Sequence, residues 1–255
     1  MSDRLDRPDR LGIVDWGIGG LGLLGHLDRA RPGLDVVYWS DTGSTPYGLV
    51  PTAALAARLR SVAGELAGRG CTEVVLACNA ASTVVDRLAG APIPVSGIIA
   101  AGVAAVPARL DGVVGVVGGR RTIRSGRYRR VLTRPGRRVV SRVAQPLSAH
   151  IEAGRIGTTA FEQDLRRIVA PLRGADAVIL ACTHYPAASD AFAAELPGTL
   201  LIDPAAQMAG DLIARLVPGT GERTILTTGD PALMRTSAEA AWAMDLPEIT
   251  SVAPA

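Results

Sequence analysis

Two stretches of this chain decide its fold, and they read alike. Residues 74–82 run Val-Val-Leu-Ala-Cys-Asn-Ala-Ala-Ser, and residues 178–186 run Val-Ile-Leu-Ala-Cys-Thr-His-Tyr-Pro. Each starts as a short apolar run typical of a strand buried on both faces, and each ends at a cysteine followed by small polar residues. Ligands of parallel α/β sheets bind at the carboxyl ends of strands, so Cys78 and Cys182 are predicted at equivalent ligand-binding edges. The alternative is that both thiols only fill core positions.

The likeness extends to a domain-sized repeat. Residues 11–17, Leu-Gly-Ile-Val-Asp-Trp-Gly, are echoed by residues 114–119, Val-Gly-Val-Val-Gly-Gly, at nearly the offset that separates the two cysteines. A repeat of roughly a hundred residues is the size of a domain. We therefore expect an α/β fold with two similar lobes related by a pseudo-two-fold axis. Each lobe should hold a mostly parallel sheet flanked by helices, with the active site between them.

The repeat also divides the chain. The first lobe is predicted to comprise residues 1–98 and 208–255, and the second lobe residues 99–207. The first carries Asp15 and Cys78, whereas the second carries Cys182 and His184. The tail from residue 224 onward is expected to pack on the first lobe. Residues 144–152 are expected to form a loop.

Composition narrows the function classes. The chain has 255 residues, 48% of them hydrophobic, yet no apolar run approaches the ~20 residues that cross a bilayer. The first ten residues lack a signal-peptide core, and three cysteines argue for reduced thiols, so we expect a cytoplasmic protein without membrane contact. All 27 basic residues are arginine. The absence of lysine excludes the usual pyridoxal-phosphate enzymes and the Walker A phosphate loop.

Ten of the arginines lie between residues 120 and 142, with no acidic residue among them. Such a segment can bind nucleic acid, but it has no interleaved aromatic residues and no docking motif. A solvated face of an arginine-rich helix is the preferred interpretation, and a nucleic-acid partner is not expected.

Two polar loops follow the first strands. Residues 15–22, Asp-Trp-Gly-Ile-Gly-Gly-Leu-Gly, form a glycine-rich turn into a helix, but the glycine spacing does not match a dinucleotide loop and the leading acid would repel a pyrophosphate. Residues 40–48, Ser-Asp-Thr-Gly-Ser-Thr-Pro-Tyr-Gly, place backbone N–H groups where they could meet a carboxylate. The alternative for the second loop is an ordinary surface turn.

Together these motifs resemble the glutamate racemase family within the aspartate/glutamate racemase superfamily. The resemblance runs the length of the chain and is carried by Asp15 in a D-x-G-x-G-G turn, Asp41-Thr42 with Pro46-Tyr47-Gly48, Cys78-Asn79-x-Ala81-Ser82, Thr122-Ile123-x-Ser125-Gly126, Cys182-Thr183-His184-Tyr185-Pro186 and Thr228-Gly229-Asp230.

The resemblance implies a racemase that needs no cofactor and acts on a small molecule, an amino acid or a related carboxylate, with a link to cell-wall peptidoglycan. Cys78 and Cys182 would face opposite sides of the substrate Cα, one removing the proton while the other delivers one. Asp15 would assist Cys78, and His184, with Glu152 as a further partner, would assist Cys182. No metal is expected, because the acids and histidines lack ligand spacing.

The resemblance also implies a set of substrate contacts, which are Trp16, Pro46, Tyr47, Gly48, Asn79, Ala80, Gly119, Thr122 and Thr183. Three of them depart from the family pattern, because Trp16 stands where serine is usual, and Ala80 and Gly119 stand where threonine is usual. The acid/base residues are kept while hydroxyl groups are lost. This suggests the same proton chemistry on a substrate other than glutamate.

Two other functions stay open from sequence. One is a related isomerisation or decarboxylation of a small carboxylate, and the other is a catalytically weak homologue that binds a partner. A homodimer is compatible with each of these functions. His26 and His150 are expected to be surface or packing residues, and Cys71 to be core.

Overall fold

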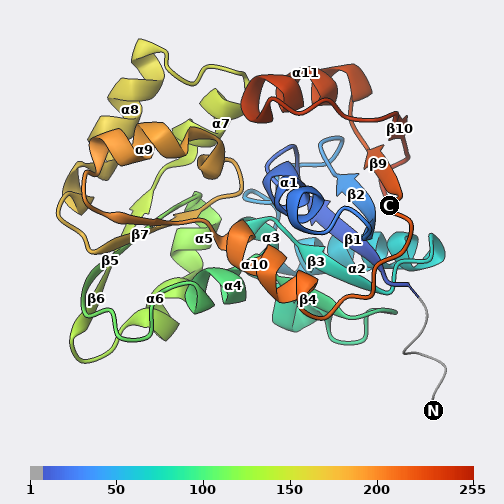
Figure 1. Cartoon of the computed structure of the whole chain (residues 1–255), viewed down its shortest axis with the longest axis horizontal. Coiled ribbons are helices and arrows are strands. Elements are labelled where there is room, and N and C mark those ends of the chain that lie inside the picture. Colours follow the sequence, from blue (N-terminus) through green and yellow to red (C-terminus); the bar gives the residue numbers. More distant parts are fainter. Residues whose placement is uncertain (1–7) are drawn as a thin grey trace.

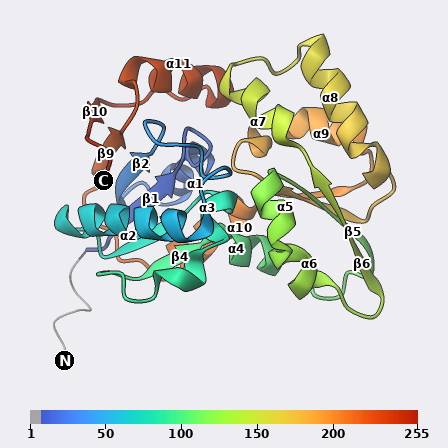
Figure 2. The same cartoon turned by 180° about the vertical axis from the view of Figure 1, so that it is seen from behind.

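The computed structural model describes residues 8–255, which fold into two lobes that each contain a parallel sheet (Figures 1 and 2). The first sheet has the strand order β10 (Ile249–Ser251), β9 (Arg223–Thr227), β2 (Asp35–Ser40), β1 (Arg10–Asp15), β3 (Glu73–Leu76) and β4 (Val95–Gly97). The second has the order β6 (Arg137–Val143), β5 (Gly112–Gly118), β7 (Ala177–Ala181) and β8 (Leu200–Ile202). The predicted α/β architecture is confirmed.

Helices cover both sheets, as the burial of the strands on both faces requires. They are α1 (Leu21–Ala30), α2 (Thr52–Gly68), α3 (Asn79–Ser82), α4 (Ile98–Ala104), α5 (Arg120–Ser125), α6 (Arg127–Leu132), α7 (Gln145–Glu152), α8 (Thr159–Val169), α9 (Ser189–Glu195), α10 (Pro204–Ile213) and α11 (Pro231–Trp242). Three single 3₁₀ turns are η1 (Val85–Leu88), η2 (Ala170–Leu172) and η3 (Tyr185–Ala188).

The repeat seen in the sequence appears as matching strand pairs. In the first sheet β1 pairs in parallel with β3, and in the second β5 pairs in parallel with β7. The side chains of these strands are almost wholly buried, and burying each large aliphatic side chain contributes about 1.5–3 kcal/mol. The cysteine-bearing segments therefore leave the two sheets at equivalent carboxyl edges.

Contacts between the lobes are extensive. Helix α10 packs against α4 and α1, and one continuous apolar core includes residues from both sheets. Helix α11 follows β9 of the first sheet but also contacts α7 of the second lobe, across the top of Figure 1. The tail thus packs on the first lobe, as expected, and reaches the second as well.

Two local expectations were wrong. Residues 145–152 form helix α7 rather than a loop, with Leu147 and Ile151 buried on one face. The arginine-rich segment is not one helix, because it comprises α5, α6 and the edge strand β6, with the left-handed Gly126 (φ 66°) separating the two helices.

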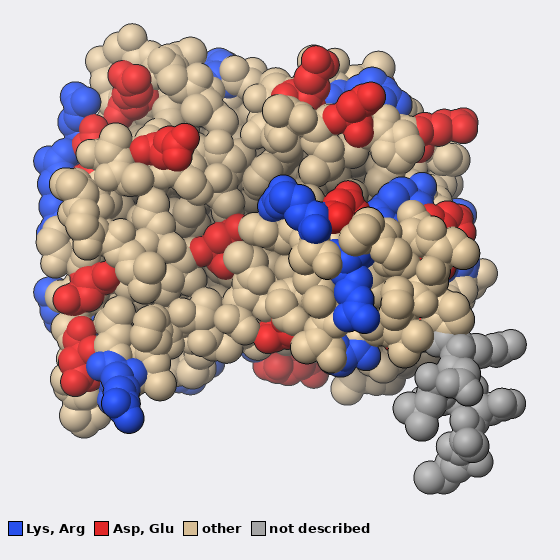
Figure 3. All heavy atoms as spheres, viewed as in Figure 1, with Lys and Arg blue, Asp and Glu red and all other residues tan. Residues whose placement is uncertain are grey.

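The arginines of that segment are also less solvated than predicted. Half of them donate hydrogen bonds to other segments: Arg121, Arg127, Arg134, Arg137 and Arg142. On the face shown in Figure 3, arginines and acidic side chains are interspersed, so that face carries no field of a single sign. Within residues 8–255 no helix is long and apolar enough to cross a membrane.

Candidate active site

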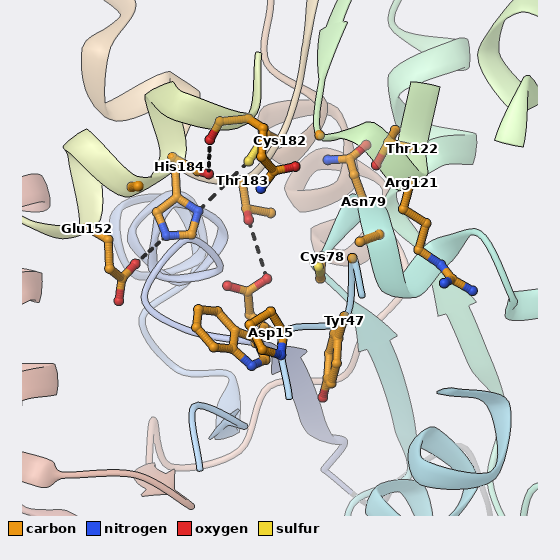
Figure 4. A pocket seen from close by; sticks show the side chains of 18 of the residues that line it. Asp15, Tyr47, Cys78, Asn79, Arg121, Thr122, Glu152, Cys182, Thr183 and His184 are labelled. Carbon is orange, nitrogen blue, oxygen red and sulfur yellow. Dashed lines mark hydrogen bonds and ion pairs between the residues drawn. The ribbon is translucent and has the colours of Figure 1, made fainter. Parts of the chain in front are cut away.

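The carboxyl edges of the two sheets meet at one cavity of about 500 Å³ (Figure 4). Four strand ends supply its centre. Asp15 is the last residue of β1, Cys78 follows β3, Gly119 follows β5 and Cys182 follows β7. The site therefore arises where apolar strands stop and their connections begin, as expected for parallel α/β sheets.

The cavity brings together every residue that the sequence analysis proposed for the site. These are Asp15, Trp16, Pro46, Tyr47, Gly48, Cys78, Asn79, Ala80, Gly119, Thr122, Glu152, Cys182, Thr183 and His184. Cys71 lies outside it, buried in the core of the first lobe. His26 and His150 are also outside the cavity and pair with carboxylates, at 3.0 Å from Asp203 and 3.2 Å from Asp164 respectively.

Cys182 has a histidine beside it. His184 follows it on the turn into η3, with Nδ1 3.9 Å from the Cys182 sulfur, and its Nε2 pairs with the Glu152 carboxylate from α7. Burial alone would lower the pKa of His184, but hydrogen bonds and negative charge from Cys182 and Glu152 outweigh burial and raise it well above its ordinary value. The raised pKa favours the charged imidazole beside the Cys182 sulfur.

Cys78 has a carboxylate as its charged neighbour, whereas Cys182 has an imidazole. Burial, followed by the negative charge of Asp15, raises the pKa of its thiol well above the ordinary value. Its position as N-cap of the short helix α3 adds backbone N–H groups from Ala80 and Ala81, which act in the other direction but more weakly. The two half-sites therefore share a strand-end cysteine and differ in its charged neighbour.

Asp15 is held between the lobes. Its Oδ2 accepts hydrogen bonds from the backbone N–H groups of Gly17 and Gly20 at 3.3 and 3.2 Å, and its Oδ1 accepts one from the Thr183 hydroxyl at 3.3 Å. Burial raises the pKa of Asp15, while the charge of His184 and these N–H groups oppose the rise. Gly19 lets the lobes approach, because a Cβ there would lie 2.3 Å from the Thr183 hydroxyl.

Trp16 presents its ring to the cavity. Its indole N–H donates to the carbonyl of Ser44 at 3.1 Å, so this donor is occupied. The rest of the half-buried side chain packs against the apolar cluster of the first lobe and lines the cavity. Ala80 and Gly119 also line it without a side-chain hydroxyl. The cavity wall is accordingly less polar than serine and threonine at these positions would make it.

Asp41 holds the loop that carries Tyr47. Its fully buried carboxylate accepts hydrogen bonds from the Tyr47 hydroxyl at 2.8 Å, from Arg58 Nε at 2.9 Å, and from the hydroxyls of Ser44 and Thr228 at 2.9 and 3.2 Å. The second interpretation of this loop, an ordinary surface turn, does not fit such a network. Tyr47 is instead fixed in the cavity wall.

Replacing Asp41 by asparagine is expected to lower the free energy of unfolding by about 3 kcal/mol. The change leaves the largely buried Arg58 guanidinium without its counter-charge, which is costly inside a protein. Chemical denaturation followed by circular dichroism measures the loss. Asp111→Asn is the matched control, since this carboxylate and its partner Arg134 are both exposed, and this variant should lose less than about 1 kcal/mol. Equal losses in both variants would contradict the assignment.

Several cavity residues were not predicted from sequence. They are Arg120, Arg121, Gln145, Ser148, Ala149, Ala153, Ala181, Leu233 and Ser237. Most come from α5 and α7, directly after strands β5 and β6, and the position of those strand ends was the signal that could have found them. Leu233 and Ser237 come from α11, and no local pattern marks them.

No group of three or more His, Cys, Asp or Glu side chains within residues 8–255 is arranged to hold a metal ion. The cavity instead places two thiols, one imidazole, two carboxylates and the amide of Asn79 around one space. Such a set can move protons at a small polar substrate.

Two parallel α/β sheets with a cavity at their strand ends are the arrangement expected of the amino-acid racemases, isomerases that work without pyridoxal phosphate, which the sequence resembles. A family model described as Asp/Glu/Hydantoin racemase matches residues 29–211. The chain belongs to this racemase family.

Similar proteins agree with that assignment. A glutamate racemase of Deinococcus radiodurans is 35% identical over 88% of this chain and 83% of its own length, and one of Pseudomonas entomophila is 36% identical over 88% and 86%. Among solved structures, glutamate racemase from Thermus thermophilus in complex with β-chloro-D-alanine is 30% identical, with a TM-score of 0.85 over 96% of this chain and 97% of that one. Glutamate racemase from Francisella tularensis in complex with D-glutamate is 26% identical, with a TM-score of 0.84 over 96% and 98%. The predicted family and enzyme class are confirmed.

Proposed function

We propose that this racemase inverts the α-carbon of an amino acid with Cys78 and Cys182 as the two acid/base groups, and that glutamate is the substrate to test first. The observation that carries the proposal is the pair of strand-end cysteines on one cavity, one from each sheet, each with its own ionisable partner. The curated relatives named glutamate racemase support the substrate.

The chemistry follows from the charges of the half-sites. We assign Cys182 as the base for one enantiomer, because the His184 imidazole lies 3.9 Å from its sulfur and can compensate a thiolate charge. Cys78 is the acid, because burial and Asp15 disfavour its anion. The thiolate takes the α-proton, and the electron pair of the broken C–H bond spreads onto the α-carboxylate. The Cys78 thiol then gives its proton to the opposite face. The enzyme ends with the charge on Cys78, ready for the mirror-image substrate.

Stabilising the carbanion is the hard part, because no electron sink is available among the side chains of the cavity. Hydrogen-bond donors aimed at the substrate carboxylate must therefore stabilise the negative charge of the carbanion in a water-poor site. The amide of Asn79 is placed for this task, since it is buried in the cavity wall. The Thr183 hydroxyl can join it only by giving up the hydrogen bond that it donates to Asp15. Reduced thiols on both half-sites favour a cytoplasmic location.

Proton nuclear magnetic resonance in D₂O, combined with chiral chromatography, tests the function on each glutamate enantiomer and on a panel of other amino acids. Loss of the Cα proton signal together with appearance of the mirror image supports racemisation. Activity should persist after removal of pyridoxal phosphate and metal ions. Decarboxylation would instead release CO₂, and a binding homologue would leave every amino acid unchanged.

A second candidate substrate is favoured by the cavity wall. Trp16, Ala80 and Gly119 remove three hydroxyl groups from it and add an indole face. An amino acid whose side chain packs on an aromatic ring would suit this wall better than glutamate. Sites that lack the hydrogen-bonding groups for a polar substrate lose on the order of several kcal/mol of discrimination.

For this second candidate, the triple variant Trp16→Ser, Ala80→Thr, Gly119→Thr is expected to raise kcat/KM for glutamate at least about tenfold and to lower it for an aromatic amino acid. Added Cβ atoms are tolerated at Gly119, where the nearest neighbour would be Gln145 Oε1 at 3.4 Å. Steady-state kinetics measures kcat/KM for glutamate and for the aromatic amino acid in both proteins. A wild-type kcat/KM for glutamate at or above ~10⁴ M⁻¹s⁻¹ would defeat this candidate and leave glutamate as the substrate.

A further inference from the structure

The amide of Asn79 carries a polar atom that no described residue satisfies. Asn79 is 2% exposed and lines the cavity, and within residues 8–255 its Nδ2 has no hydrogen-bond partner. Leaving a buried donor unpaired costs about 1–3 kcal/mol, so native structures rarely keep one without a use. In Figure 4 the amide nitrogen lies on the side of Cys182. The free N–H₂ group is therefore available to a ligand in the cavity.

The other end of the same amide is occupied. Tyr128, on α6 of the second lobe, donates its hydroxyl to Asn79 Oδ1 at 2.8 Å. Burial, with a smaller contribution from Asp203, raises the pKa of Tyr128, so the phenol stays protonated and remains a donor throughout the working pH range. Because the phenol holds the carbonyl end of the amide, the amino end is left facing the cavity.

The backbone is arranged to bring Tyr128 to this position. Gly126 adopts a left-handed conformation with φ 66° between α5 and α6, which glycine allows at little cost and which turns α6 toward the first lobe. Gly102 on α4 leaves room for the ring, because a Cβ there would lie 2.5 Å from the Tyr128 hydroxyl. Neither glycine touches the cavity.

Two arginines hold this region of the second lobe against the first. Arg127 donates to the carbonyl of Thr83 at 3.0 Å, and Arg121 donates to the Thr83 hydroxyl at 2.9 Å and to the carbonyl of Val50 at 2.6 Å. Thr83 directly follows α3, the helix that begins with Asn79. The donor and acceptor of the Tyr128–Asn79 bond are thus clamped at the same contact between the lobes.

We propose that Tyr128 is a positioning residue, which orients the Asn79 amide so that its N–H₂ group binds the substrate α-carboxylate. The proposal rests on the proposed function for the identity of the ligand, but not for the orientation of the amide. Tyr128 touches neither thiol nor the cavity, and its effect passes through Asn79.

A double-mutant cycle tests this role. Tyr128→Phe keeps the ring and should lower kcat/KM about tenfold, mainly through a higher KM, because the amide can then rotate away from the carboxylate. Asn79→Ala should lower it about 10–100-fold. In the Asn79→Ala background, Tyr128→Phe should change kcat/KM less than twofold, since no amide remains to be oriented.

Tyr185→Phe is the matched control. Its buried hydroxyl donates to the carbonyl of Ala144 and does not contact Asn79, so its effect should be multiplicative with that of Asn79→Ala. Gly102→Ala is a second probe, expected to mimic Tyr128→Phe by displacing the phenol. An undiminished effect of Tyr128→Phe in the Asn79→Ala background would overturn the proposal.

A measurement without turnover separates this proposal from the proposed function. The side-chain amide signal of Asn79 in a ¹⁵N–¹H spectrum is identified by its loss in Asn79→Ala, and Tyr128→Phe should shift it. An unshifted signal overturns the proposal whatever the activity. Failure of the wild-type protein to racemise any amino acid would overturn the proposed function, whereas a shifted signal would still support the orienting bond.

Discussion

Replacing either cavity cysteine by alanine is expected to abolish net inversion, with a loss on the order of 10⁴-fold or more, because the two thiols act as one unit. Each variant keeps a single base that reaches one face of the substrate. Cys182→Ala should therefore exchange the Cα proton of one enantiomer with D₂O, and Cys78→Ala that of the other, both without inversion. Proton nuclear magnetic resonance on each enantiomer measures this exchange.

Cys71→Ala is the control for the cysteine variants. Cys71 is 4% exposed and packs in the first-lobe core away from the cavity, so its replacement should leave kcat and KM unchanged. The two-cysteine mechanism does not survive if Cys182→Ala still interconverts the enantiomers at the wild-type rate.

His184→Asn is expected to lower kcat/KM by about 10²–10⁴-fold, the range typical for loss of a residue that assists proton transfer. The enantiomers of an amino acid have equal free energies, so kcat/KM must fall equally in both directions. An asymmetric role of His184 can appear only in how the loss divides between kcat and KM for each enantiomer. Steady-state kinetics in both directions measures this division.

The pH dependence of kcat/KM shows in which direction loss of His184 shifts the acid limb. The pKa of His184 is raised, so the imidazole is charged through neutral pH and loses its charge only as the pH rises through that higher value. If Cys182 is the base, loss of this positive charge disfavours the anion that it must form, and the acid limb of kcat/KM should move upward in pH. His150→Asn is the control, because His150 pairs with Asp164 outside the cavity. An acid limb that stays in place in His184→Asn would contradict the assigned role.

The centre of the site could be predicted from sequence because it lies where apolar strands stop. Val75 and Ile179 are fully buried, and the abrupt change to Cys78 and Cys182 marks the strand ends without reference to tertiary structure. Asp15 follows the same rule at the end of β1. The hydrophobic pattern therefore placed both cysteines at strand ends before any contact between the lobes was known. The roles of Asp15, His184 and Glu152 were expected from the family resemblance.

The walls of the cavity could not be predicted in the same way. Helix α7 is short and buries only Leu147 and Ile151, so its apolar period is too brief to distinguish it from a loop. Strand β6 lies at a sheet edge, and its three arginines interrupt the apolar alternation, although Arg137 is buried and Arg142 half-buried. Leu233 reaches the cavity from the far end of the chain, through packing that only tertiary structure defines.

The bond between Tyr128 and Asn79 could not be foreseen either. The two residues are far apart in sequence and in different lobes, and although the sequence marks Asn79 as a substrate contact, it does not mark Tyr128. Their contact depends on the turn at Gly126 and on the space at Gly102, which are features of the assembled lobes.

Residues at the strand ends and residues in the cavity walls differ in how freely they can mutate, and this difference affects how such enzymes diverge in evolution. Asp15 is buried, and Cys78 and Cys182, although half-buried, follow strands whose side chains are fully buried, so the cores of the two sheets fix the positions of all three. Trp16 and Ala80 are only half-buried, and Leu233 is 65% exposed, so these positions can mutate with little loss of folding. Selection can therefore change the amino acid that a descendant accepts while the residues at the strand ends are inherited unchanged.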